Sequence, residues 1–263
     1  MTGADKRSWV EQVMGLPVSV LVRGDGARGD GVDAAVQLAY ADLREADARF
    51  SPYLSDSEVS RLGRGEAFKA SPDLLEVQRL CDQAHALTGG AFDARTPLGI
   101  WDPSGMVKGW AAERASARLA GLGLDWCLNA GGDVVVDCPS GEPFRVGISD
   151  PLDPRAIAAV AVRLSGAVAT SGTSARGAHL YDPSTGTAST SVASVTVSGP
   201  SLLWADVLAT AAFVRGVEVL PDGYQALVIS LDGSQAVTAG WAHSLSKISP
   251  PAALMNPRLE VER

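Results

Sequence analysis

Leu202-Leu-Trp-Ala-Asp206-Val-Leu-Ala-Thr210-Ala-Ala-Phe213 is an apolar run interrupted by two polar residues. Its length and composition predict a largely buried helix over residues 202–213. One helical turn places Asp206 and Thr210 on the same face, where a carboxylate and a hydroxyl suit a hard cation. A buried carboxylate is costly without a partner, which favours a metal site. The alternative is a surface Asp beside a Thr that bonds the carbonyl of its own helix.

The residues before this helix supply a histidine and two glycine-bounded polar segments. The first reads Ala167-Val-Ala-Thr-Ser-Gly172, and the second reads His179-Leu-Tyr181-Asp182-Pro-Ser-Thr-Gly186. Histidine accepts a proton near neutral pH, so His179 is a candidate general base. The other histidines, His85 and His243, are interpreted as structural or solvated side chains.

The composition indicates a soluble globular chain and argues against nucleic-acid binding. The 263 residues are 46% hydrophobic and 20% charged, and the net charge is −8. An acidic chain without a run of Lys or Arg is poorly suited to a phosphate backbone. The length fits one large domain or two small ones, but no shift in composition marks a boundary. We therefore expect a single domain over residues 1–263, with residues 250–263 as a surface extension.

Targeting and cysteine patterns predict a cytoplasmic protein with reduced thiols. The N-terminal residues form no apolar signal region, and no segment reaches the ~18 apolar residues of a membrane span. We therefore expect no membrane partner. Cys81, Cys127 and Cys138 are odd in number and form no Cys-x-x-Cys pair, which favours buried free thiols over disulfides or structural zinc.

The hydrophobic periodicity predicts an α+β fold. Helices are expected over residues 32–50, 72–87, 107–119 and 202–213, and a short helix is expected to begin near Ser57. Strands are expected over residues 14–23, 126–128, 134–136, 144–148, 157–164, 192–197 and 226–229. Because these elements mix without a regular strand–helix–strand alternation, mixed or antiparallel sheets with packed helices are favoured over a doubly wound sheet.

Two further motifs are consistent with binding a ligand. In Gly90-Ala-Phe-Asp93 the glycines permit close approach to a ligand, or they form a helix C-cap and turn. In Ser104-Gly-Met-Val-Lys108-Gly109 a helix start and a lysine form either an anion site or a plain capped surface helix. The sequence contains no P-loop, no dinucleotide fingerprint after a strand and no Gly-x-Ser-x-Gly elbow.

The ordered set of motifs resembles the ApbE-type flavin transferases, which are Mg-dependent FAD:protein FMN transferases. The resemblance covers residues 14–214. Its motifs are Met14-Gly15, Phe50-Ser-x-Tyr53-x-x-Asp56-Ser57-Glu58, Gly90-Ala-Phe-Asp93, Lys108-Gly109, Asn129-x-Gly131-Gly132-Asp133, Ala169-Thr-Ser-Gly172, His179-x-x-Asp182-Pro-x-x-Gly186 and Ala205-Asp206-x-x-Ala209-Thr210. It departs from the family between Asp93 and Lys108, where this chain is shorter, and in having no export signal.

The resemblance implies a T-fold-like α+β architecture with FAD in a cleft. Flavin or nucleotide contacts are implied for Met14, Tyr53, Ala91, Phe92, Asp93, Asp102, Lys108 and Tyr181. Magnesium, or manganese in its place, would be held by the Gly105 carbonyl, Asp206, Ala209 and Thr210, and His179 matches the family's proposed general base.

The reaction implied by the resemblance joins FMN from FAD to a Ser or Thr hydroxyl of an acceptor flavoprotein and releases AMP. The acceptor motif resembles Ser/Thr-Gly-Ala-Ser/Thr. This chain has Ser165-Gly-Ala-Val168, which lacks the last hydroxyl, so self-flavinylation is not expected. Two alternatives remain at this point: a Mg-dependent FAD pyrophosphatase that gives FMN and AMP, and a non-catalytic flavin-binding protein.

Overall fold

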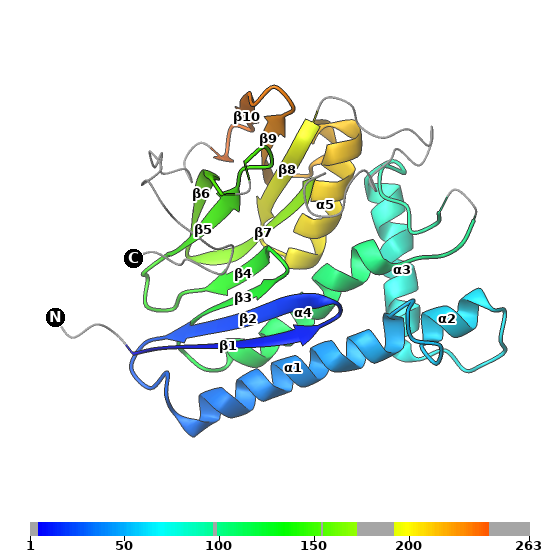
Figure 1. The fold of residues 1–263 in the computed structure, drawn as a ribbon, viewed down its shortest axis with the longest axis horizontal. Helices are drawn as coiled ribbons and strands as arrows, with labels where there is room; N and C mark the ends of the chain where they lie inside the picture. The colour runs from blue at the N-terminus through cyan, green and yellow to red at the C-terminus, as the bar shows by residue number, and fades with distance from the viewer. Residues whose placement is uncertain (1–4, 97–98, 154, 173–191, 242–263) are drawn as a thin grey trace.

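A computed structural model describes residues 5–96, 99–153, 155–172 and 192–241 of the chain. Within these residues the fold centres on an eight-stranded sheet in which every neighbouring pair is antiparallel (Figure 1). In spatial order its strands are β1 (Lys6–Val13), β2 (Leu16–Arg23), β3 (Asp125–Ala130), β4 (Asp133–Asp137), β7 (Ser165–Gly172), β8 (Val192–Gly199), β9 (Gln225–Ser230) and β10 (Gln235–Val237).

The two faces of the sheet are covered by different elements (Figure 1). One face packs on the helices α1 (Asp30–Phe50), α4 (Ser104–Ala120) and α5 (Leu202–Arg215), which share the largest core cluster. The other face is covered by the β5 (Phe144–Ser149) and β6 (Ile157–Arg163) hairpin. Beyond the helical layer lie α2 (Glu58–Gly63) and α3 (Pro72–Leu87), and a short 3-10 turn, η1 (Val217–Val219), follows α5.

Alternation along the strands explains how both faces become apolar. In β3, Trp126 and Leu128 join the helix-side core, whereas Cys127 between them faces Phe144 of the hairpin. In a strand successive side chains point to opposite faces, so an unbroken apolar run is buried on both. The central strands therefore sit between two layers.

The ends of the helices follow capping rules. The Ser201 hydroxyl accepts a hydrogen bond from the Trp204 N–H and begins α5, and Gly216, with φ of 92°, ends it. The Ser57 hydroxyl caps α2 in the same way, as the sequence predicts. The Ser201 cap fixes where α5 begins, and therefore the position of Asp206 along the sheet.

The predicted α+β class is confirmed, and each predicted helix is present. Helix α4 begins at Ser104, as the reading of Ser104 or Gly105 as a helix start predicts, and three residues before the start that periodicity gives. The strand predicted from residue 14 begins at Leu16. Met14 and Gly15 instead form a two-residue hairpin turn with φ of 57° and 70°, as a type I′ turn requires.

Strands β1, β7 and β10 were not predicted. β1 alternates exposed polar side chains at the sheet edge, and β7 is built mainly of Ala, Ser, Gly and Thr. Small and polar residues carry little strand propensity of their own. Their pairing with neighbouring strands therefore decides their conformation.

Other expectations concern the cysteines, the membrane and the C-terminal tail. Cys81, Cys127 and Cys138 are free and buried, as predicted. Among the helices of the described residues, none combines the length and apolar character that crossing a bilayer demands. Residues 250–263 lie outside the described residues.

Candidate functional site

A lysine ammonium lies between two carboxylates where the helical layer meets the sheet. Lys108 of α4 forms ion pairs with Asp133, the first residue of β4, and with Asp206 of α5 at 3.2 Å. The side chains of Asp133 and Asp206 expose only 3% and 5% of their surface. Placing two carboxylates in a nearly solvent-free position is costly unless their charges are well compensated.

Asp133 connects this cluster to the neighbouring strand. Its Oδ1 accepts a hydrogen bond from the Thr170 N–H of β7 at 3.1 Å, while its Oδ2 contacts Lys108. The Gly131-Gly132 turn before it is closed by the Asn129 side chain, which accepts from the Gly132 N–H at 2.7 Å. The β3–β4 hairpin therefore holds the Asp133 carboxylate at the end of β7.

The polar face of α5 continues from Asp206 to Thr210, one turn later. The Thr210 hydroxyl lies 3.0 Å from the Ser171 hydroxyl of β7. The sequence-predicted pair thus occupies one helix face that meets the end of β7. A carboxylate and two hydroxyls at this spacing form a set of hard oxygen donors.

Close contact between α4 and α5 brings Lys108 to Asp206. A Cβ at Gly109 would lie 3.0 Å from the Leu203 Cα and 3.2 Å from the Asp206 Cβ, so only glycine fits without a shift. The Glu113 carboxylate, one turn further along α4, accepts from the Ser201 hydroxyl at 2.7 Å and from the Leu203 N–H at 2.9 Å. It thereby fixes the start of α5 on α4 and suits the positive end of the helix dipole.

The electrostatics of the cluster keep the lysine charged. Burial by itself would lower the pKa of Lys108, but the carboxylates of Asp206 and Asp133 outweigh burial and raise the pKa above its ordinary value. Lys108 is therefore a fixed positive charge at neutral pH and is unsuited to act as a base.

A cleft of about 860 Å³ opens between α2, α3 and the loop that leads into α4, the helix that carries Lys108. Its lining includes Cys81, His85, Asp93, Arg95 and Trp101. Burial raises the pKa of Cys81 to about 12, so this thiol is a poor nucleophile. The size and the mixed polar and aromatic lining suit a small organic ligand.

The Gly90-Ala-Phe-Asp93 segment joins the cleft to α4. The Thr88 hydroxyl accepts from the Phe92 N–H at 3.0 Å and fixes the turn. The buried Phe92 ring packs on Gly105 of α4, whereas Asp93 and Ala94 line the cleft. The segment therefore acts as a wall that is buried on one side and exposed to the cleft on the other.

Met14 and Tyr53 lie at the C-terminal end of α1. The Met14 N–H donates to Asp47 in the last turns of α1 at 3.3 Å, and Tyr53 follows the end of that helix with 94% of its surface exposed. Leu16, beyond the β1–β2 turn, lies close against Gly131 of the β3–β4 turn. The two hairpin tips and the Asp133 cluster thus occur at the same end of the sheet.

The predicted site residues fall into three groups. The structure brings Lys108, Asp206 and Thr210 together, with buried Ala209 on the same helix and Gly105 one turn before Gly109. Asp102 is exposed, and its carboxylate accepts from the Ser104 N–H at the start of α4. His179 and Tyr181 lie outside the described residues, so the structure is silent on both.

Two residues at the site were missed from the sequence. Asp133 was noted only as part of a motif, and Ser171 only as part of a polar segment. A carboxylate that directly follows two glycines in a tight hairpin is a usable signal, because such a turn fixes its direction. Ser171 gave no comparable signal, since its neighbour across the site is far away in the sequence.

The oxygen donors fit a magnesium-type ion better than a soft metal. The described residues contain no group of three or more His, Cys, Asp or Glu side chains arranged to hold a metal. The oxygen set of Asp206 and Thr210, with Ser171 alongside, is nevertheless of the hard type, and the cluster already accommodates one cation, the Lys108 ammonium. The chemistry of these donors is therefore compatible with Mg²⁺ or Mn²⁺.

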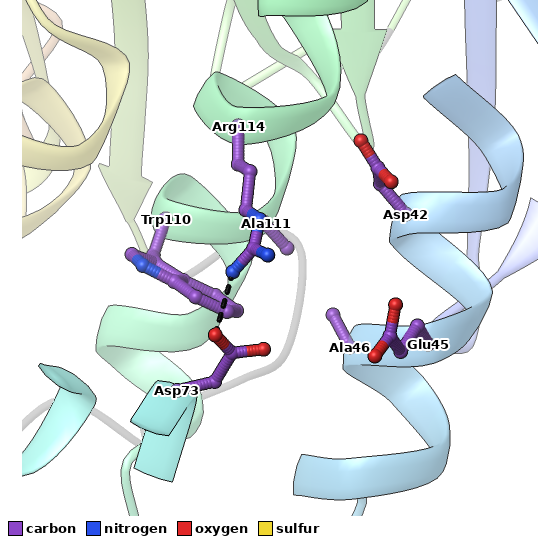
Figure 2. A pocket seen from close by; sticks show the side chains of 7 residues that line it. All are labelled: Asp42, Glu45, Ala46, Asp73, Trp110, Ala111 and Arg114. Atoms are coloured by element: carbon purple, nitrogen blue, oxygen red, sulfur yellow. Dashed lines mark hydrogen bonds and ion pairs between the residues drawn. The ribbon is translucent and has the colours of Figure 1, made fainter. Parts of the chain in front are cut away.

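A second hollow, between α1, α3 and α4, is too small for a ligand (Figure 2). Its volume is about 10 Å³, room for about one water molecule. Figure 2 shows the Arg114 guanidinium pointing at the Asp73 carboxylate, at 2.8 Å, beneath the Trp110 ring. This hollow lies at the seam between helices that ion pairs hold together.

Comparison with known proteins identifies the family to which the chain belongs. The model of the ApbE family matches residues 14–97 and 100–228. A curated relative from Rhodobacter capsulatus, named FAD:protein FMN transferase, is 34% identical over 145 residues, which cover 51% of this chain and only 28% of that protein. A second with the same name, from Vibrio cholerae, is 26% identical over 239 residues, covering 67% of this chain and 72% of that protein.

Solved structures share the fold. The ApbE protein of Thermotoga maritima aligns with a TM-score of 0.80 at 20% identity, covering 92% of this chain and 100% of that one. The flavin transferase ApbE of Vibrio cholerae gives 0.78 at 23% identity with the same coverage, and that of Pseudomonas stutzeri gives 0.76 at 22%, covering 93% and 98%. Since the family model spans well over half of its residues, this chain belongs to the ApbE family.

Proposed function

We propose that this protein is a Mg-dependent FAD:protein FMN transferase. The observation that carries the proposal is the Asp206–Thr210 face of α5, which offers hard oxygen donors at a nearly solvent-free position in a chain of the ApbE family. The cleft lined by Asp93 supports it, because it offers a ligand-sized space at the loop that leads into α4. The curated relatives carry this activity in their names.

In the proposed reaction, an acceptor Ser or Thr hydroxyl attacks the FMN-side phosphorus of FAD. A new phosphorus–oxygen bond forms, the bond to the bridging oxygen breaks, and AMP leaves with that oxygen. His179, outside the described residues, is the proposed acceptor of the hydroxyl proton. The acceptor protein is proposed to carry a Ser/Thr-Gly-Ala-Ser/Thr-like motif.

The residues proposed to hold Mg²⁺ are Asp206, Thr210 and the backbone carbonyls of Gly105 and Ala209. When bound, the ion would neutralise charge on the pyrophosphate and on the leaving phosphate. The chain's own contribution is to fix the donors. The Glu113 contacts and the close approach at Gly109 hold α5, so the Asp206 carboxylate needs little reorganisation.

For the flavin, we propose contacts from Met14 and Tyr53 at the hairpin end and from Ala91, Phe92 and Asp93 at the cleft wall. Asp102, Lys108 and Tyr181 are proposed near the nucleotide. Lys108 would act there as a fixed positive charge, since its ammonium is already held by two carboxylates. We also propose a cytoplasmic location and one domain over residues 1–263.

The test is incubation of the purified protein with FAD, Mg²⁺ and an acceptor fragment that carries the motif. We expect AMP release in a one-to-one ratio with flavin-labelled acceptor, read by chromatography and by in-gel flavin fluorescence. AMP and FMN without a labelled acceptor would show a pyrophosphatase instead. FAD binding without AMP release would show a flavin-binding protein.

A further inference from the structure

We infer that Asp133 is a positioning residue that holds Lys108 and thereby keeps the Asp206 carboxylate available to a divalent cation. The inference rests on the proposed metal site at Asp206. It assigns a role to a residue that is neither a proposed metal ligand nor part of the cleft lining.

The Lys108 ammonium contacts the carboxylates of Asp133 and Asp206 at the same time. An ammonium and a divalent cation compete for the same carboxylate, because both are attracted by its charge. Lys108 therefore opposes metal binding at Asp206 unless another anion retains it.

The Asp133 carboxylate is held firmly in position. It begins β4 directly after the Gly131-Gly132 turn, its side chain is 3% exposed, and its Oδ1 accepts from the Thr170 N–H at 3.1 Å. A carboxylate held by backbone on one side stays in position when its partner shifts. Asp133 can therefore keep the lysine charge compensated while Asp206 turns to a metal.

The Lys108 ammonium and the Asp133 carboxylate form a neutral pair by themselves, so Lys108 does not need to keep its contact with Asp206 when a metal ion binds there. Without the Asp133 charge, Lys108 has Asp206 as its single carboxylate partner among the ion pairs of the described residues, and a divalent cation would have to displace it.

The variant Asp133→Asn separates charge from hydrogen bonding. The amide keeps an oxygen that can accept from the Thr170 N–H but loses the attraction for the ammonium. We expect Mn²⁺ affinity, measured on the full chain by electron paramagnetic resonance of free Mn²⁺, to fall roughly tenfold. Asp125→Asn is the matched control, because Asp125 is a buried, ion-paired carboxylate at the opposite end of the same hairpin. It should leave Mn²⁺ affinity unchanged.

Variants at Lys108 test whether the effect passes through the lysine. Lys108→Met removes the competing ammonium and should bind Mn²⁺ at least about threefold more tightly. In that background, Asp133→Asn should change the affinity less than about twofold, because nothing remains to be held. Weaker binding by Lys108→Met, or a full tenfold loss in the double variant, would overturn the inference.

The same titration separates this inference from the proposed function. If the wild type binds no Mn²⁺, or if Asp206→Ala binds as tightly as the wild type, the metal site is not at Asp206 and both ideas fall. If Asp206→Ala weakens binding but Asp133→Asn does not, only the role of Asp133 is overturned.

Discussion

Helix α4 carries one member of each of two charge clusters that are arranged in opposite senses. At Lys108 a single cation lies between two carboxylates, and at Asp73 a single carboxylate lies between Arg49 and Arg114. The carboxylate side chains are 3% and 5% exposed in the first cluster and 16% in the second, and the cations that α4 contributes are 23% exposed at Lys108 and 46% at Arg114. Figure 2 shows that the second lies at the seam between helices.

The difference in burial separates the cluster at the proposed site from a cluster that joins helices. Water screens the Arg114–Asp73 pair, so it contributes little to stability and creates little local potential. The two carboxylates of the Lys108 cluster are largely shielded from water, so their charges interact strongly with the ammonium. Burial of charge, more than the number of ion pairs, therefore points to the site.

The largest expected effect comes from removing the cation that α4 contributes to each cluster. Lys108→Met should lower the free energy of unfolding by about 3–5 kcal/mol, because two buried carboxylates lose their counter-charge. Arg114→Met keeps the aliphatic stem and should cost at most about 1 kcal/mol. Urea unfolding measures both. Equal costs would mean that burial does not distinguish the two clusters.

Next in size is the effect of Asp206→Ala on catalysis. Loss of the proposed ligand should reduce Mg-dependent AMP release at least ~100-fold, or about 2.7 kcal/mol, while the protein stays folded. Asp73→Ala removes a carboxylate from the other cluster and should leave the rate within about twofold. Full activity in Asp206→Ala would remove this residue from the metal site.

A smaller effect is expected at the contact that joins α4 to α5. Gly109→Ala should destabilise the protein by about 1–3 kcal/mol, although alanine favours helices, because its Cβ meets the Leu203 backbone. Gly31→Ala, in the first turn of α1 with open space around it, should stabilise by up to about 1 kcal/mol. Thermal unfolding followed by circular dichroism compares them. A neutral Gly109→Ala would show that the helices can separate freely.

The smallest effect tests an intermediate case, the buried Asp125–Arg23 pair. Burial, the largest single influence, raises the pKa of Asp125, but hydrogen bonds from Ser140 and Arg23 together outweigh it and hold the pKa below its ordinary value. A depressed pKa means stability that is present above about pH 4 and lost as the pH falls through the folded-state value. Asp125→Asn should therefore cost about 1 kcal/mol at pH 7 and less at pH 3. A cost that grows on acidification would contradict this sign.

Local sequence pattern was sufficient to predict those elements whose own residues determine their conformation. The apolar run with Asp206 and Thr210 predicted α5 and its polar face, and the Ser57 cap predicted α2. It failed for β1 and β7, whose polar or small residues become strands only by pairing with β2, β4 and β8. It also failed at the β1–β2 turn, where an apolar Met14 adopts a positive φ that its residue type disfavours.

The sequence by itself determined the helix that bears Asp206 and Thr210, because one turn of a helix fixes which residues share a face. Only the tertiary structure decided that Lys108 would contact both Asp206 and Asp133. That meeting depends on strand order, which places β4 beside β7, and on the glycine at 109, which lets α4 approach α5. Contacts between distant segments carry no local periodicity, so the balance of buried charge becomes visible only once the chain is packed.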